Sequence, residues 1–157
     1  MADHGGWGTM RELIGILITY NGGAIYHRSK KLSTTTANTT EGESIATSRA
    51  GEIVEVARNA LEAAGELQNH PTFVGTDNKP NMLIASMQGN ASRVRHALRR
   101  WAVFQQRVQD GTCAIGHIPD SQMMADFLTK WVDKTKMATS VAYATNSRNR
   151  VASSSTA

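Results

Sequence analysis

The sequence predicts an α/β domain in which a mixed sheet carries helices on both faces. Three observations support this class: a β-hairpin pattern near the N-terminus, an alternation of helical and strand patterns after it, and enough apolar residues for one core. The chain has 157 residues, of which 40% are hydrophobic. That length and composition suit one compact domain.

The composition narrows the class of protein. Cys113 is the only cysteine, so no disulfide can form within the chain, which fits a reducing compartment and also fits a secreted chain that lacks disulfides. The longest apolar run, Leu13–Ile18, is far too short to span a membrane, and residues 1–8 lack the basic and apolar regions of a signal peptide. We therefore expect a soluble intracellular protein.

The first elements are a hairpin and a long helix. The β-branched run Glu12–Tyr20 is followed by the turn Asn21-Gly22-Gly23 and by a second strand pattern, Ala24–Leu32. A helix follows, with Thr39 or Thr40 as its N-cap, and ends near residue 64. Its buried stripe is expected at Ala46, Ala50, Ile53, Val54, Ala57, Ala60, Leu61 and Ala64.

Glu43 lies where the buried stripe of this helix begins, one step before Ala46. A carboxylate on the core side of a first turn is costly unless a cation or hydrogen-bond donors meet it. Two interpretations are open. Glu43 is either a metal ligand or a capping-box glutamate whose partner is Thr40, three residues earlier.

The second half of the chain alternates again. The run Thr72–Asp77 predicts a strand that ends on a carboxylate, at a position where functional loops gather. We place the domain at residues 1–132 and expect residues 133–157 to be a disordered tail, because no apolar periodicity continues there. The remaining elements are expected as helices at Asn81–Met87 and Ser92–Gln109, a strand at Cys113–Ile118 and a last helix from Asp120 or Ser121 to Val132.

Two charge patterns point to chemistry. Glu43, Asp77 and Asp126 are far apart in the sequence but would converge if the strand runs between the two helices, and converging carboxylates call for a metal. Between Asp77 and Asp110 there is no acidic residue, so this segment is a basic block. The block is either a solvated face or a nucleic-acid-binding surface. Its candidate phosphate contacts are Arg93, Arg95, Arg99 and Arg100.

Several short motifs follow one another in a recognisable order. Residues 39–43 read TTEGE at a helix start, residues 76–78 read TDN at a strand end, and residues 125–130 read ADFLTK. Residues 21–31 and 92–96 add NGGAIYHRSKK and SRVRH. In this order and spacing, over residues 1–132, the motifs resemble the ribonuclease H domain of copia-type LTR retrotransposon polyproteins.

The resemblance implies a ribonuclease H-like fold and hydrolysis of the RNA strand of RNA–DNA hybrids with two Mg²⁺ ions, or Mn²⁺ as an alternative. Glu43 and Asp77 would be metal ligands and Asp126 would hold the second ion. His117 would either assist proton transfer or product release, or be an ordinary strand-end histidine. The implied partners are the hybrid and a reverse transcriptase domain, in the cytoplasm, the nucleus or a retroelement particle.

The sequence also departs from the family. The family's first strand ends in D-A-D, and Met1 lies where the leading Asp is expected, so we expect the first strand to be largely missing. Asp3 would replace that ligand only if the N-terminus paired beside Thr72–Asp77. Three carboxylates carry less negative charge than two divalent ions carry positive charge, so the ions should bind weakly. We therefore expect hydrolysis to be absent or very slow. The alternative is a catalytically silent module, or a decayed retrotransposon fragment, that at most binds nucleic acid.

Overall fold

The computed structural model describes residues 1–5, 12–33, 35–36, 38–86 and 98–147 of the chain. Within these ranges no helix is long and apolar enough to cross a membrane. The elements are the strands β1 (Ala2–Gly5), β2 (Leu13–Tyr20), β3 (Gly23–Lys31), β4 (Thr72–Thr76) and β5 (Cys113–His117), the helices α1 (Thr39–Ala63), α2 (Lys79–Ala85), α3 (Leu98–Gln109) and α4 (Lys134–Ala144), and the short 3-10 helices η2 (Asp120–Gln122) and η3 (Asp126–Leu128).

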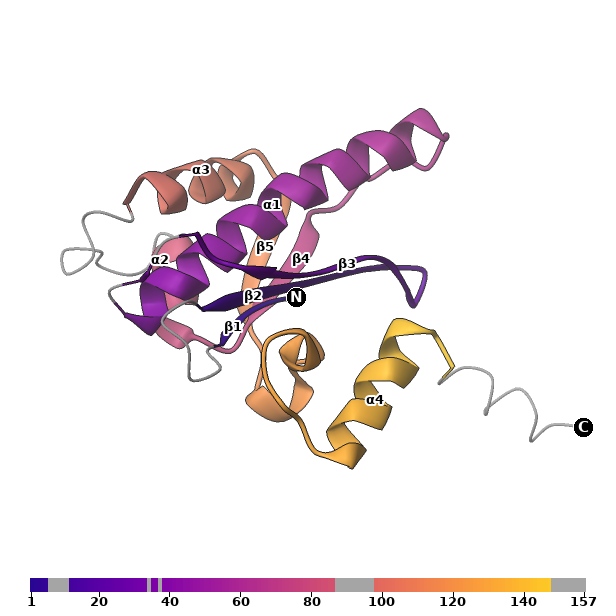
Figure 1. Ribbon diagram of the computed structural model, residues 1–157. Coiled ribbons are helices and arrows are strands. Elements are labelled where there is room, and N and C mark those ends of the chain that lie inside the picture. The colour runs from indigo at the N-terminus through magenta and orange to yellow at the C-terminus, as the bar shows by residue number, and fades with distance from the viewer. Residues whose placement is uncertain (6–11, 34, 37, 87–97, 148–157) are drawn as a thin grey trace, which may run out of the picture.

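The strands form an antiparallel sheet in the order β1-β2-β3 and a parallel sheet of β4 and β5 (Figure 1). The predicted α/β class is confirmed, but the strands form two sheets where we expected one mixed sheet. β1 and β4 contact each other, so the two sheets adjoin at that point. This contact brings Asp3 of β1 close to Asp77, which follows β4.

The predicted hairpin of β2 and β3 is confirmed. Tyr20 pairs with Gly23, which leaves Asn21 and Gly22 as a two-residue turn. Both turn residues have positive φ, 48° for Asn21 and 83° for Gly22. A type I′ turn requires such angles, and asparagine and glycine adopt them at lower cost than other residues.

A first strand is present, where we expected it to be largely missing. In the antiparallel ladder to β2, Ala2 pairs with Ile16 and Asp3 pairs with Gly15. Because successive side chains of a strand point to opposite faces, Ala2 joins the core with Ile16 while Asp3 faces the other side of the sheet. The register of β1 therefore decides which face receives the carboxylate.

The N-cap of α1 is Asn38, one residue before the predicted positions. Its side-chain oxygen accepts the N–H of Glu41 at 2.9 Å. The capping-box interpretation of Glu43 is therefore wrong, because another residue already caps the helix. Glu43 is buried because hydrogen-bond donors on β1 and β4 meet its carboxylate, as described below.

The buried stripe of α1 is confirmed only in its first half. Ala46, Ala50 and Val54 are buried, whereas Ala60 and Ala64 are exposed. The helix diverges from the strands toward its C-terminal end, so its last turns have no sheet to cover (Figure 1). Periodicity predicted a helix correctly there, but not the extent of its packing.

Apolar side chains fill both faces of the three-stranded sheet. On one face, Ile16 of β2 packs in a core that includes α1 and Trp101 of α3. On the other face, Leu17 packs with Met123 and with Tyr143 of α4. Helices thus lie on both faces of the sheet, as predicted (Figure 1).

A buried polar chain links the three helices α1, α2 and α3. Trp101 Nε1 donates to Asn81 Oδ1 at 2.9 Å, and Asn81 Nδ2 donates to Thr47 Oγ1 at 2.8 Å. All three side chains belong to residues that are at most 1% exposed. Buried polar groups are costly without partners, so this chain fixes how the helices sit against one another.

The segment after β5 departs from the expected single helix over residues 120–132. The chain forms η2 and η3 instead, with 3-10 hydrogen bonds such as Thr129 N–H to the Asp126 carbonyl at 2.9 Å. Met123 is buried, as its place on the apolar stripe predicts, but Trp131 is 82% exposed. Tertiary contacts of Thr129, described below, override the helical pattern of the sequence.

Helix α4 occupies part of the region that we expected to be a disordered tail. Asp133 caps it by accepting the N–H of Lys136 at 2.8 Å. Ser140 is buried, and Tyr143 packs in the second core. Its small and polar residues give little periodicity, which explains why the sequence did not predict a packed helix. Residues 148–157 lie outside the described part of the chain.

Candidate metal centre

Three aspartates from three elements come together. Asp3 lies on β1, Asp77 directly follows β4, and Asp126 is the first residue of η3. Each offers a carboxylate oxygen, and these oxygens lie within 4.8 Å of one another. Asp3 is 1% exposed and Asp126 is 0% exposed, while Asp77 is half-buried. We call these three residues the aspartate cluster.

Close packing of η3 on β2 places Asp3 beside Asp126. A Cβ atom on Gly15 would lie 2.8 Å from Thr129 Cγ2 and 2.9 Å from Leu128 Cβ, so a residue without a side chain is needed for this approach. The Thr129 hydroxyl has two acceptors within reach of its single hydrogen, Asp3 Oδ2 and the backbone carbonyl of Asp126, the latter at 3.1 Å. Gly15 and Thr129 thus hold the two carboxylates together.

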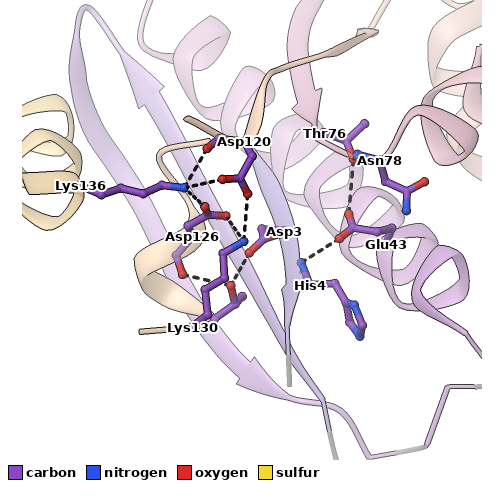
Figure 2. Close-up of polar contacts among 10 residues, drawn as sticks. Asp3, His4, Glu43, Thr76, Asn78, Asp120, Asp126, Lys130 and Lys136 are labelled. Carbon is purple, nitrogen blue, oxygen red and sulfur yellow. Dashed lines mark hydrogen bonds and ion pairs between the residues drawn. The ribbon is translucent and has the colours of Figure 1, made fainter. Parts of the chain in front are cut away.

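Glu43 lies beside the aspartate cluster rather than within it. Its carboxylate accepts the backbone N–H of His4 at 3.1 Å and the hydroxyl of Thr76 at 3.4 Å (Figure 2). Burial, and then the charges of Asp3 and Asp77, raise the pKa of Glu43 to about 9. In the metal-free protein this carboxyl is therefore protonated at neutral pH.

The structure brings Asp3, the conditional ligand, into the converging set. We expected Glu43, Asp77 and Asp126 to converge, with Asp3 added only if the N-terminus paired beside Thr72–Asp77, and the structure joins Asp77 and Asp126 with Asp3. The condition for Asp3 was a place beside Thr72–Asp77, and β1, which is hydrogen-bonded to β2, reaches that place by contacting β4. Glu43 approaches from α1 and is held by the backbone of β1 and the side chain that precedes Asp77.

Two lysines neutralise Asp126 (Figure 2). Lys130 Nζ lies 3.0 Å from Asp126 Oδ1, and Lys136 Nζ contacts Asp126 Oδ2. Each ammonium group also lies 3.4 Å from a carboxylate oxygen of Asp120. Lys130 follows Asp126 by four residues, whereas Lys136 reaches the carboxylate from α4.

The electrostatics of the cluster suit a divalent cation. Burial raises the pKa of Asp3 and Asp77, because each carboxylate is desolvated among other carboxylates. Asp126 Oδ1 is buried, and its neighbour among the described residues is the Lys130 ammonium group at 3.0 Å. The donors are hard carboxylate oxygens, which Mg²⁺ and Mn²⁺ prefer, and a cation would relieve the crowding of negative charge. The residues present therefore fit such an ion.

The predicted histidine lies next to the cluster. His117 ends β5, is exposed, and its Nε2 lies 3.1 Å from the backbone carbonyl of Asp77. This contact is to the main chain of an aspartate and not to its carboxylate. A role in proton transfer or product release stays a prediction.

The predicted phosphate contacts fall mostly outside the described part of the chain. Arg93 and Arg95 lie in the range 87–97, and the side chain of Arg99 is likewise not described. Arg100 is half-buried and lies 3.5 Å from Glu41 at the start of α1. The nucleic-acid-binding role of the four arginines stays a prediction.

Sequence reasoning missed Thr129, Lys130 and Lys136 as parts of the site. The first two lie within the ADFLTK stretch, where a lysine four residues after Asp126 falls on the same face of a helical turn. That spacing was a usable signal. Lys136 gave none, because it lies in the segment that we expected to be a tail.

No protein-family model matches the chain, and no curated protein matches it. Solved structures do resemble it. Ribonuclease H1 from the archaeon Halobacterium salinarum aligns with a TM-score of 0.59 and 15% identity over 82% of this chain and 90% of that one. LC11-RNase H1, solved in complex with an RNA/DNA hybrid, aligns with a TM-score of 0.55 and 18% identity over 82% of this chain and 90% of that one.

A third match is the N-terminal ribonuclease H domain of a Mycobacterium tuberculosis protein, solved as a fusion with maltose-binding protein. It aligns with a TM-score of 0.59 and 14% identity over 89% of this chain and 92% of that one. Identities this low show the fold alone: the chain has a ribonuclease H1-like fold.

Proposed function

We propose that the chain is a metal-dependent nuclease that hydrolyses the RNA strand of RNA–DNA hybrids. The observation that carries the proposal is the aspartate cluster, placed where β1, β4 and η3 meet within a ribonuclease H1-like fold. A fold alone does not decide chemistry. Buried carboxylates that converge from separate elements do favour metal-assisted hydrolysis of a phosphodiester.

The aspartate cluster would hold two Mg²⁺ ions, or Mn²⁺ in their place. When bound, such ions supply a water nucleophile at neutral pH and a counter-charge for the leaving oxygen. The part of this chain is to fix the ligand oxygens. Asp3 is held through Thr129, Asp77 by the end of β4, and Asp126 by the packing of η3.

Glu43 is our proposed fourth acidic group, because it lies close enough to Asp3 and Asp77 for both to raise its pKa. A cation at the cluster would favour its ionised form. Four acidic residues, instead of three, match the charge of two divalent ions once Lys130 and Lys136 are displaced from Asp126, so the reason to expect absent or very slow hydrolysis is weaker. We therefore expect measurable activity.

A narrower origin, in a copia-type retrotransposon, is part of the proposal. The motifs that support it begin α1 (TTEGE), end β4 (TDN) and include η3 (ADFLTK), so each contributes an acidic residue at or beside the cluster. If the chain derives from such a retrotransposon, a reverse transcriptase domain would be its partner, and His117 would assist proton transfer or product release.

The basic block would hold the phosphates of the hybrid, through Arg93, Arg95, Arg99 and Arg100. Phosphate contacts release bound counterions, so affinity for the hybrid should fall with salt. We expect the double variant Arg99→Ala, Arg100→Ala to bind a hybrid more weakly, and its plot of log affinity against log salt to be flatter by about one unit per lost contact. Fluorescence anisotropy across a salt series measures both. An unchanged slope would mean that the block is only a solvated face.

Cleavage selectivity tests the proposed function directly. A hybrid with a labelled RNA strand is compared with RNA–RNA and DNA–DNA duplexes of the same sequence, with Mg²⁺, with Mn²⁺ and with a chelator. We expect cleavage of RNA in the hybrid alone, and none in the chelator. Binding of the hybrid without cleavage under any of these conditions would instead favour the catalytically silent module.

A further inference from the structure

We propose that Lys136 is an internal cation that competes with a divalent metal ion for Asp126, so that α4 sets how readily the aspartate cluster takes up metal. The inference rests on the proposed metal centre. It concerns a residue of the segment after the ribonuclease-like motifs, which none of those motifs includes.

The contacts of Lys136 make it a counterion of Asp126. Its Nζ contacts Asp126 Oδ2, lies 2.8 Å from the backbone carbonyl of Asp120, and lies 3.4 Å from Asp120 Oδ2. The Lys136 side chain is 17% exposed and that of Asp126 is fully buried. A buried carboxylate without a partner is strongly destabilising, so the metal-free protein depends on such a cation.

Helix α4 determines where the Lys136 ammonium lies. The backbone N–H of Lys136 is held by Asp133 in the first turn, and the other end of the helix packs through Tyr143 beside Leu17 of β2. Lys130, by contrast, belongs to the same turn as Asp126. The positive charge that neutralises Asp126 Oδ2 thus comes from α4, an element that contributes no aspartate to the cluster.

A metal ion and Lys136 cannot both use the same oxygen of Asp126. Like charges repel at short range, most strongly where water is excluded, so an ion at the cluster requires the ammonium group to move away. Two ligands that exclude each other are coupled, and coupling factors of about 5 to 150 are typical in proteins. The lysine therefore raises the metal concentration that fills the site.

The test compares Lys136→Met with Lys134→Met. Both variants lose one positive charge in the first turn of α4, but Lys134 is exposed and Lys136 faces the cluster. Mn²⁺ affinity is measured from the electron paramagnetic resonance signal of free Mn²⁺, and Mg²⁺ affinity by competition. We expect about tenfold tighter binding for Lys136→Met and wild-type affinity for Lys134→Met.

A second measurement uses the unaltered chain, in case Lys136→Met does not fold. The rate at which each lysine amine reacts with an acetylating reagent is followed by mass spectrometry, with and without Mg²⁺. If the ion displaces the ammonium group, Lys136 should react faster in Mg²⁺ while Lys134 should not change.

The outcomes separate this inference from the proposed function. If the wild-type chain binds metal, but Lys136→Met binds no more tightly than Lys134→Met and the reactivity of Lys136 is unchanged, the competition is refuted and the metal centre stands. If neither wild type nor Lys136→Met binds Mn²⁺ or Mg²⁺, both the competition and the metal centre are refuted.

Discussion

Replacing Asp77 by asparagine should lower Mg²⁺-dependent cleavage of an RNA–DNA hybrid by about three orders of magnitude, since a metal ligand is worth several kcal/mol of transition-state stabilisation. The amide keeps the shape of the side chain but removes the negative charge from one of three converging oxygens. The initial rate of RNA-strand cleavage, at saturating Mg²⁺, measures the effect.

The fold should survive this change, because Asp77 follows β4 and is half-buried rather than fully enclosed. Far-ultraviolet circular dichroism checks the fold, and Asp110→Asn serves as the matched control, since Asp110 is exposed and contacts Gln106 at the end of α3. Cleavage by Asp77→Asn at the rate of this control would rule out the aspartate cluster as the site of hydrolysis.

The second large effect concerns stability. Trp101→Ala should lower the free energy of unfolding by about 3–5 kcal/mol, the usual cost of deleting a buried aromatic side chain. Trp101 is 1% exposed, and its indole N–H also donates to the side-chain oxygen Oδ1 of the buried Asn81. Domains of this size are stable by only about 5–15 kcal/mol, so the loss is a large fraction of the total stability. Urea unfolding followed by circular dichroism measures the loss.

Two further variants separate packing from hydrogen bonding. Trp101→Phe keeps most of the ring but removes the donor to Asn81 Oδ1, so a smaller loss of about 1–3 kcal/mol is expected. Val103→Ala, at a 49% exposed position of the same helix, should change stability little. Equal losses for Trp101→Ala and Val103→Ala would show that the polar chain between α1, α2 and α3 does not hold these helices together.

Local signals in the sequence were sufficient for most elements of the fold. The turn at Asn21 and Gly22 needs backbone angles that these two residues favour, so the hairpin could be predicted from a short stretch. The strand Thr72–Thr76 and the helix before it follow from hydrophobic periodicity in the same way. In these segments local preference and tertiary packing agree.

Where tertiary contacts decide, the sequence was a poor guide. The apolar stripe from Met123 to Trp131 predicts one helix, but the approach of Thr129 to Asp3 and to β2 breaks it into 3-10 turns. Lys136 gave no signal, because its role depends on a helix with little apolar periodicity of its own. Asp3 could be judged only once the partner and register of its strand were known.

The tight fit at Gly15 also limits how this protein can evolve. A methyl group there would meet Thr129 Cγ2 at 2.8 Å, so alanine at this position is harmful while Thr129 is present. Serine at residue 129 keeps the hydroxyl that binds Asp3 and lacks that methyl group, so it would ease the same alanine in part. The two substitutions are therefore epistatic: their order of appearance matters, and residues 114 positions apart in the sequence, 15 and 129, are constrained to change together.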